Sequence, residues 1–206
     1  MQNLALAPIR LDLLLESIAG FIALAVSHYA NKAFRLTSQK KLSDLSTGFL
    51  VLSAAMFGHV IGTWYFFVLQ GGDVSSFEGN TLFAVVRIAY GTMKIMAYIL
   101  FAVSTRPTGG DHSSTLGLFM ALPILIDPRL DMVAIIILVV VVLQSAMNYL
   151  AVRSRYALYV LVGFCLLLLS HISAVYAERG YVLSQVFQFL GFIALLFMLI
   201  RAGRET

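Results

Sequence analysis

Two histidines in apolar segments are the residues of this sequence best suited to cofactor chemistry. His59 lies in the predicted membrane span 43–69, and His171 lies in the predicted span 156–177. Both spans start on the same side of the membrane, so a rise of 1.5 Å per residue places both imidazoles about 22–26 Å from that side. Neutral imidazoles at matched depth on two helices can be the axial ligands of a haem iron. The sequence therefore predicts a b-type haem between the two histidines, with Arg87 as the partner of a propionate group.

A structural role for the two histidines is the alternative, and it is the more common role. Ala54, Gly58 and Gly62 place a small residue at every fourth position around His59. Such a stripe could receive a flat macrocycle, but it is also typical of close packing between membrane helices. Histidines in spans often form hydrogen bonds across helices. A structural or gating role for the two histidines is therefore retained as the alternative to haem ligation.

Other polar residues within the spans are also candidates for function, because polar groups are costly in a bilayer. Arg87 and Lys94 are seven residues apart and share one face of the predicted span 81–103. Glu16 is expected to neutralise Arg87. No carboxylate is expected at the depth of Lys94, so this lysine would be solvated by amides, be deprotonated or bind an anionic ligand. The amides available at that depth are Gln144, Asn148, Gln185 and Gln188.

The elements that carry these residues are membrane helices. The chain is 60% hydrophobic and only 12% charged, with a mean hydropathy of +0.91, whereas soluble domains carry about 25% charged residues. The single cysteine, Cys165, excludes a zinc or iron–sulfur site built on several cysteines. Catalytic motifs of hydrolases and phosphate loops are absent from the sequence, so independent catalytic activity is not expected. The predicted spans are 12–33, 43–69, 81–103, 132–152, 156–177 and 181–202.

A seventh, shorter segment at about 113–127 decides the topology. Its apolar part, 114–126, is short enough to be a short span, a tilted span or a re-entrant helix. If it crosses the membrane, most lysines and arginines fall on one side, as the positive-inside rule requires. The basic residues then lie in loops and serve topology, so no nucleic-acid partner is expected. The prediction is a seven-span protein of the cell membrane with the N-terminus outside and the C-terminus in the cytoplasm.

An internal repeat is visible in the sequence. The segment 34–52 aligns without gaps onto 149–167, pairing Phe34 with Tyr149 and Gly48 with Gly163. The predicted fold is therefore all-α: a single polytopic domain, 1–206, of two parallel three-helix repeats joined by the linker helix. The repeats cover about 11–104 and 131–203.

The segment 28–52 of the first repeat, HYANKAFRLTSQKKLSDLSTGFLVL, resembles a small three-helix membrane unit that is common in archaea. That unit reads as an aromatic-rich helix end, a short polar turn, then leucine and Gly-Phe. The resemblance covers each repeat separately and implies the fold and an archaeal origin. It implies nothing about chemistry.

Three classes of function remain open. The first is a membrane subunit associated with electron transfer, which would bind the haem or act as a cofactor-free partner of a respiratory complex. The second is a transporter or channel in which Arg87 and Lys94 line the path of an anionic solute. The third is a ligand-sensing or scaffolding membrane module. In every case the partners are the lipid bilayer and other membrane subunits.

Overall fold

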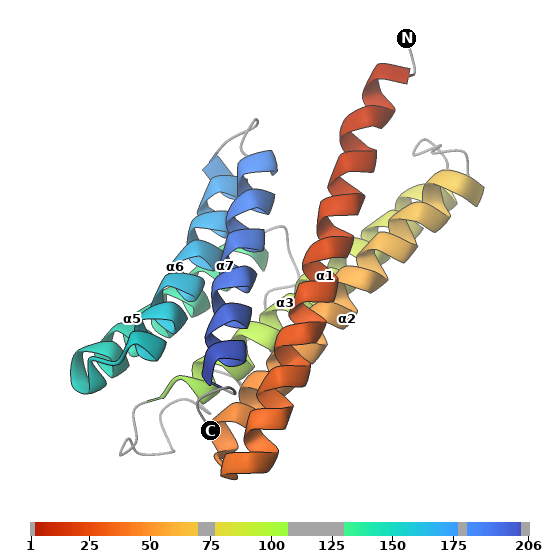
Figure 1. The fold of residues 1–206 in the computed structure, drawn as a ribbon. Coiled ribbons are helices and arrows are strands. Elements are labelled where there is room, and N and C mark those ends of the chain that lie inside the picture. Colours follow the sequence, from red (N-terminus) through yellow and green to blue (C-terminus); the bar gives the residue numbers. More distant parts are fainter. Residues whose placement is uncertain (1–2, 70–76, 107–129, 177–180, 203–206) are drawn as a thin grey trace.

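The chain folds entirely into long helices wherever its structure is described. The computed structural model describes residues 3–69, 77–106, 130–176 and 181–202 (Figure 1). The helices are α1 (Asn3–Thr37), α2 (Lys40–Leu69), α3 (Phe77–Ser104), α5 (Leu130–Val152), α6 (Arg155–Tyr176) and α7 (Tyr181–Ala202). Each contains a segment long and apolar enough to cross a membrane. Helices are favoured there because lipid offers the backbone no hydrogen-bond partners.

These six helices confirm the predicted all-α, multi-pass membrane bundle. Their apolar segments agree within a few residues with the six longer spans predicted from sequence. The seventh predicted helix, at about 113–127, lies outside the described residues.

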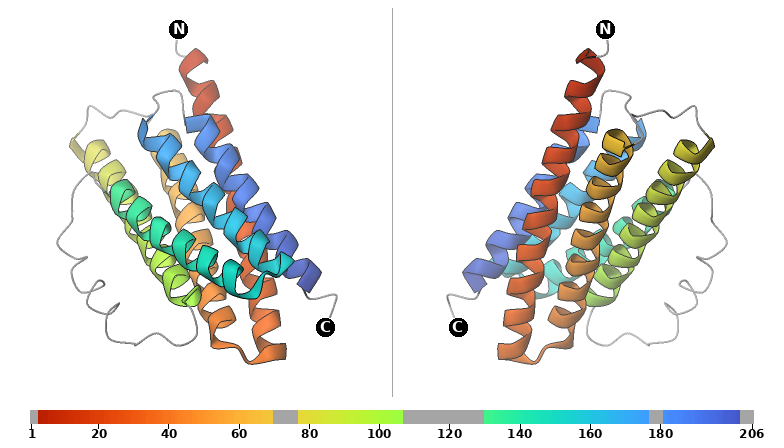
Figure 2. Two further views of the ribbon diagram at one scale, coloured as in Figure 1. Left: turned by 90° about the vertical axis from the view of Figure 1, so that its left-hand side faces the viewer. Right: turned by 90° about the vertical axis from the view of Figure 1, so that its right-hand side faces the viewer.

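The described helices form a closed ring in chain order. α1 packs on α2, α2 on α3, α3 on α5, α5 on α6, α6 on α7, and α7 returns to α1. The ring thus consists of two sets of three consecutive helices, α1–α3 and α5–α7. The sets meet at two interfaces, one between α1 and α7 and one between α3 and α5 (Figure 2). Residues from all six helices can reach the middle of the ring, which allows a site to be assembled between the two sets.

The two short turns of the ring, α1–α2 and α5–α6, have the same backbone geometry. Ser38 and Arg153 are the non-glycine residues with positive φ among the described part of the chain, at 54° and 49°. Each donates its backbone N–H to the carbonyl four residues earlier, Phe34 and Tyr149 respectively, at 2.7 Å. The gap-free alignment pairs Phe34 with Tyr149 and also pairs these two turn residues. The alignment thus matches residues that occupy equivalent backbone positions.

Close packing of the second and third helix of each set also follows one pattern. A Cβ on Gly48 would lie 2.6 Å from the Phe101 ring and 3.3 Å from the carbonyl oxygen of Ala97. A Cβ on Gly163 would lie 2.6 Å from Leu195 and 3.2 Å from the carbonyl oxygen of Gly191. In both sets the glycine faces a carbonyl and the side chain one turn later. Glycine is needed here because the helices approach too closely for any side chain.

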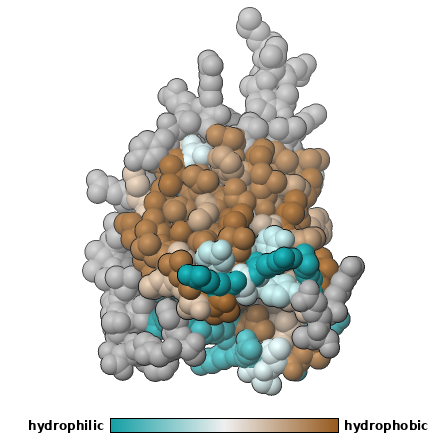
Figure 3. Space-filling view, turned by 60° about the vertical axis from the view of Figure 1, so that its left-hand side comes forward, coloured by the Kyte–Doolittle hydropathy of each residue, from teal (hydrophilic) through white to brown (hydrophobic). Residues whose placement is uncertain are grey.

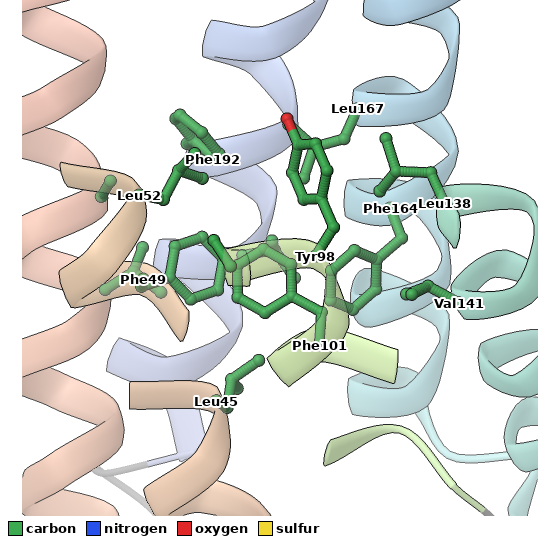
Figure 4. Close-up of a cluster of buried hydrophobic side chains, with 14 of the residues drawn as sticks. Leu45, Phe49, Leu52, Tyr98, Phe101, Leu138, Val141, Phe164, Leu167 and Phe192 are labelled. Carbon is green, nitrogen blue, oxygen red and sulfur yellow. The ribbon is translucent and has the colours of Figure 1, made fainter. Parts of the chain in front are cut away.

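An aromatic cluster fills one half of the ring (Figure 4). Phe49, Phe101, Phe164 and Phe192, from α2, α3, α6 and α7, are fully buried. Their ring centroids are separated by 4.5 Å for Phe49–Phe101, 5.5 Å for Phe101–Phe164 and 5.9 Å for Phe49–Phe192. We call these four residues the aromatic plug. It closes the middle of the ring near the end where α2 and α6 begin.

One face of the ring is apolar above that end. Figure 3 shows a broad hydrophobic band with hydrophilic side chains gathered in a belt beneath it. The helix ends and turns on this side carry most of the basic residues of the described segments: Lys32, Arg35, Lys40, Lys41, Arg106, Arg153, Arg155 and Arg201. We call this side the basic end. The band is suited to lipid and the belt to an interface with water.

α3 and α5 run in the same direction. Thr105, just after α3, donates a hydrogen bond from its hydroxyl to Gln144 Oε1 at 2.8 Å and accepts one from Asn148 Nδ2 at 2.6 Å. Since Gln144 and Asn148 belong to the C-terminal half of α5, the C-terminal parts of both helices lie together at the basic end. α3 therefore ends, and α5 begins, at opposite ends of the ring.

Candidate functional site

A buried carboxylate and a histidine form an ion pair between α1 and α2. His59 Nδ1 lies 2.7 Å from Glu16 Oε2, and the Glu16 residue is only 1% exposed. The other carboxylate oxygen, Oε1, is buried without a hydrogen-bond partner among the described residues. A charged carboxylate is costly in the bilayer unless a cation or a proton compensates it. This pair is therefore a group that can hold a proton in either of two places.

Tyr90 and Lys94 of α3 extend this pair toward the middle of the ring. The imidazole of His59 stacks on the Tyr90 ring, with centroids 4.4 Å apart and planes 16° from parallel. Lys94 Nζ lies 4.8 Å from the centroid of the same ring. Tyr90, Lys94 and Tyr98 follow one another at four-residue intervals, so they share one face of α3. That face supplies an aromatic platform with a cation beside it.

A second histidine lies on the other set of helices. His171 Nε2 of α6 shares a hydrogen bond of 2.5 Å with the Tyr98 hydroxyl, and both residues are buried. The other nitrogen of the His171 imidazole, Nδ1, lies 3.8 Å from Oδ1 of Asp131, which is in the first turn of α5. Both nitrogens of this imidazole therefore face groups that can exchange protons.

Lys94 links the two acid–histidine pairs. It lies within electrostatic range of both carboxylates, Glu16 and Asp131, and of His171. One lysine thus interacts electrostatically with two acids that belong to different sets of helices. We call the seven residues the ionisable network: Glu16, His59, Tyr90, Lys94, Tyr98, Asp131 and His171. The network begins beside the aromatic plug, because the ring centroids of Tyr98 and Phe101 are 6.1 Å apart. It extends from there toward the end where α5 begins, and His59 lies ten residues beyond Phe49 on α2.

Two expectations about partners are corrected by this geometry. Glu16 pairs with His59 and not with Arg87, whose side chain is exposed. His59 lies on a neighbouring helix at the depth of Glu16, which makes it the closer partner.

Lys94 also has carboxylates within range, contrary to the expectation. Asp131 directly precedes the predicted span 132–152, but in the structure it begins the span of α5 and its carboxylate lies 3.8 Å from His171 Nδ1. Gln144 and Asn148 bind Thr105 at the basic end of α3, and so they serve helix packing there. Gln185 and Gln188 are both buried in α7.

Sequence analysis missed Asp131, and a signal for it was present. Extending the same gap-free alignment backwards from Phe34 and Tyr149 pairs Glu16 with Asp131. The two acids thus occupy paired positions of this alignment, in the first helix of each set. His59 and His171 are one turn apart in the same alignment, yet each faces the acid of its own set. Tyr90 and Tyr98 gave no signal beyond their spacing from Lys94.

The predicted haem ligands fit a metal unequally. At His59 the Nδ1 atom is hydrogen-bonded to a carboxylate and Nε2 has no hydrogen-bond partner among the described residues, as in metal-binding histidines that are oriented by a carboxylate. At His171 the Nε2 atom is engaged by Tyr98, so ligation there would require this hydrogen bond to break. The glycines of the small-residue stripe also differ in their surroundings. Gly62 packs against Val86 of α3, whereas Gly58 faces open space. The haem therefore stays a prediction, and so does the role of Arg87 toward a propionate.

Within the described segments no group of three or more histidine, cysteine or acidic side chains could hold a metal ion. The groups that the network does bring together are two acid–histidine pairs and one lysine, all of which can bind a proton. The resemblance to small archaeal three-helix units stays a prediction as well. Comparison of the chain with protein-family models, curated proteins and solved structures gave no match, so the geometry of the network is the basis for function.

Proposed function

We propose that this chain is an integral membrane protein that moves protons through the ionisable network at the middle of its helix ring. The observation that carries the proposal is the buried Glu16–His59 pair, 2.7 Å apart, whose carboxylate also interacts electrostatically with Lys94. Chains of acidic, histidine and lysine side chains within spans are typical of proton relays in pumps and transporters. The same path would serve a transporter or a partner subunit of a respiratory complex, the two leading classes indicated by the sequence.

The aromatic plug supports a carrier and not an open channel. Phe49, Phe101, Phe164 and Phe192 close the ring between the network and the basic end. A proton held by the network can therefore leave toward the basic end only after these four rings move apart. Alternating access of this kind is typical of membrane proteins built from two repeated sets of helices.

Proton uptake by proteoliposomes tests the proposal. Vesicles loaded with a pH-sensitive dye and driven by a potassium gradient with valinomycin should acidify faster with the protein than without it. Lys94→Met should lower this protein-dependent rate at least about tenfold, because methionine keeps the length of the side chain but removes the cation shared by both acids.

Lys32→Met is the matched control, because Lys32 is exposed at the basic end and outside the network. Its rate should stay within about twofold of the wild type, as expected for a surface charge. Wild-type vesicles that acidify no faster than protein-free vesicles would overturn the proposed function. A Lys94→Met protein with the wild-type rate of proton uptake would show that Lys94 is not part of the proton pathway.

The arrangement of α3 and α5 supports the seven-span topology. Because α3 ends and α5 begins at opposite ends of the ring, the chain between Arg106 and Leu130 has to pass from one end to the other. A crossing by the predicted helix at 113–127 satisfies this requirement. With the basic end in the cytoplasm, α1 begins outside and α7 ends inside. The equivalent turns and glycine contacts support a duplication of one three-helix unit.

Electron transfer with a b-type haem is the second candidate function. The observation in its favour is the Glu16–His59 hydrogen bond, which orients the imidazole through Nδ1, while Nε2 has no hydrogen-bond partner within the described part of the chain. Protein purified with haem supplied should then show a Soret band that His59→Ala abolishes. Protein that stays colourless under these conditions would rule out haem binding. The proposal of a proton pathway would be unaffected by that result.

A further inference from the structure

The two sets of helices carry the same acid–histidine arrangement with different access to water. Glu16 and Asp131 are equivalent in the alignment, and each faces the histidine of the second helix of its set. The Glu16 side chain is 2% exposed and its pair is closed at 2.7 Å, whereas the Asp131 side chain is 54% exposed and its pair is open at 3.8 Å. One pair is thus an interior site, and the other lies at the end of a span.

We infer that Asp131 and His171 form a second protonation site, through which the network exchanges protons with water at the end of the ring where α5 begins. This inference rests on the proposed function and names the port of the same pathway. It goes beyond that function because the port lies on the second set of helices, outside the Glu16–His59 pair.

The position of Asp131 suits a port. It lies in the first turn of α5, where the unpaired backbone N–H groups of the helix favour a negative charge. The charged and titratable groups that face it are Lys94 and Tyr98 of α3 and His171 of α6. Two of these groups, Lys94 and His171, can be cations, so the ionised carboxylate at the end of the span interacts with cationic partners on the interior side.

Proton transfer through the port needs no other reactant. A proton from water binds the Asp131 carboxylate and gives the neutral acid. In the tautomer whose Nε2–H donates to the Tyr98 hydroxyl, His171 Nδ1 then accepts this proton from the acid. The transfer forms an imidazolium and restores the carboxylate. The 3.8 Å separation exceeds a direct hydrogen bond, so one bridging water or a rotation of the exposed Asp131 side chain completes the step.

Lys94 transmits the change to the interior site. It lies within electrostatic range of His171 and of both acids. A neutral Asp131 no longer attracts this lysine, and an imidazolium at His171 repels it. Both changes leave Glu16 as its remaining anionic partner, so protonation at the port alters the charge balance at Glu16.

Variants of Asp131 test the port in the proteoliposome assay. Asp131→Asn should lower proton uptake at least about tenfold, because an amide cannot take up a proton, and Asp131→Glu should retain uptake. Asp44→Asn makes the same chemical change at the basic end and should leave uptake within about twofold of the wild type. A thermal unfolding midpoint within a few degrees of the wild type would show that Asp131→Asn still folds.

Cysteine labelling measures whether position 131 is in contact with water, which a proton port requires and a purely structural role of Asp131 does not. In a Cys165→Ser background, a water-soluble maleimide present on both sides of the vesicles should label Asp131→Cys but not Glu16→Cys. An unlabelled Asp131→Cys, or Asp131→Asn that takes up protons at the wild-type rate, would overturn the port. Absence of uptake by the wild type would instead overturn the proposed function together with this inference.

Discussion

Glu16→Gln is expected to abolish most of the proton uptake, with a loss of at least about tenfold. Glutamine keeps the volume of the side chain and an oxygen that can accept the hydrogen bond from His59 Nδ1. It cannot bind a proton or balance the charge of Lys94. The buried pair between α1 and α2 should therefore form in the variant, but without its two protonation states. Dye-loaded proteoliposomes measure the rate.

The comparison that makes this result specific is Asp44→Asn, an acid-to-amide change in α2 near the basic end. It should retain uptake, and both variants should remain monodisperse in detergent. A folded Glu16→Gln protein with the wild-type rate would show that protons do not pass through the Glu16–His59 pair. The histidine would then be a structural partner of the acid, as the more common role of such residues predicts.

Gly163→Ala is expected to have the largest effect on stability. A Cβ at this position would lie 2.6 Å from Leu195 and 3.2 Å from the Gly191 carbonyl oxygen. The carbonyl belongs to the backbone of α7, so α6 and α7 would have to separate. Overpacking of this kind costs about 1–3 kcal/mol, and it should lower the thermal unfolding midpoint measured in detergent.

Gly58→Ala is the matched control, because no atom lies within 4 Å of a Cβ at Gly58. Alanine also favours a helix over glycine by about 0.8–1.0 kcal/mol, so this variant should unfold at the same temperature or a slightly higher one. A Gly163→Ala protein as stable as Gly58→Ala would contradict the close approach of α6 and α7. Gly48→Ala makes the equivalent change against the carbonyl of Ala97 and should resemble Gly163→Ala.

Sequence alone determined that the chain is a helical membrane protein and where its spans lie. Apolar runs of span length with few charges leave the helix as the element that satisfies the backbone in lipid. The alignment of Phe34 with Tyr149 also placed the two turns, since both Ser38 and Arg153 have the backbone conformation that it pairs. These features depend on residues close together along the chain.

Only the tertiary structure decided which polar groups meet. Glu16 could have been neutralised by Arg87 or by His59, and the rotation of each helix about its axis selected His59. Asp131 could have been a loop charge, but the packing of α5 between α3 and α6 turned it toward His171. Helix rotation and partner choice depend on close contacts between distant segments, such as Gly48 with Phe101, and the spacing of residues within one span does not specify them.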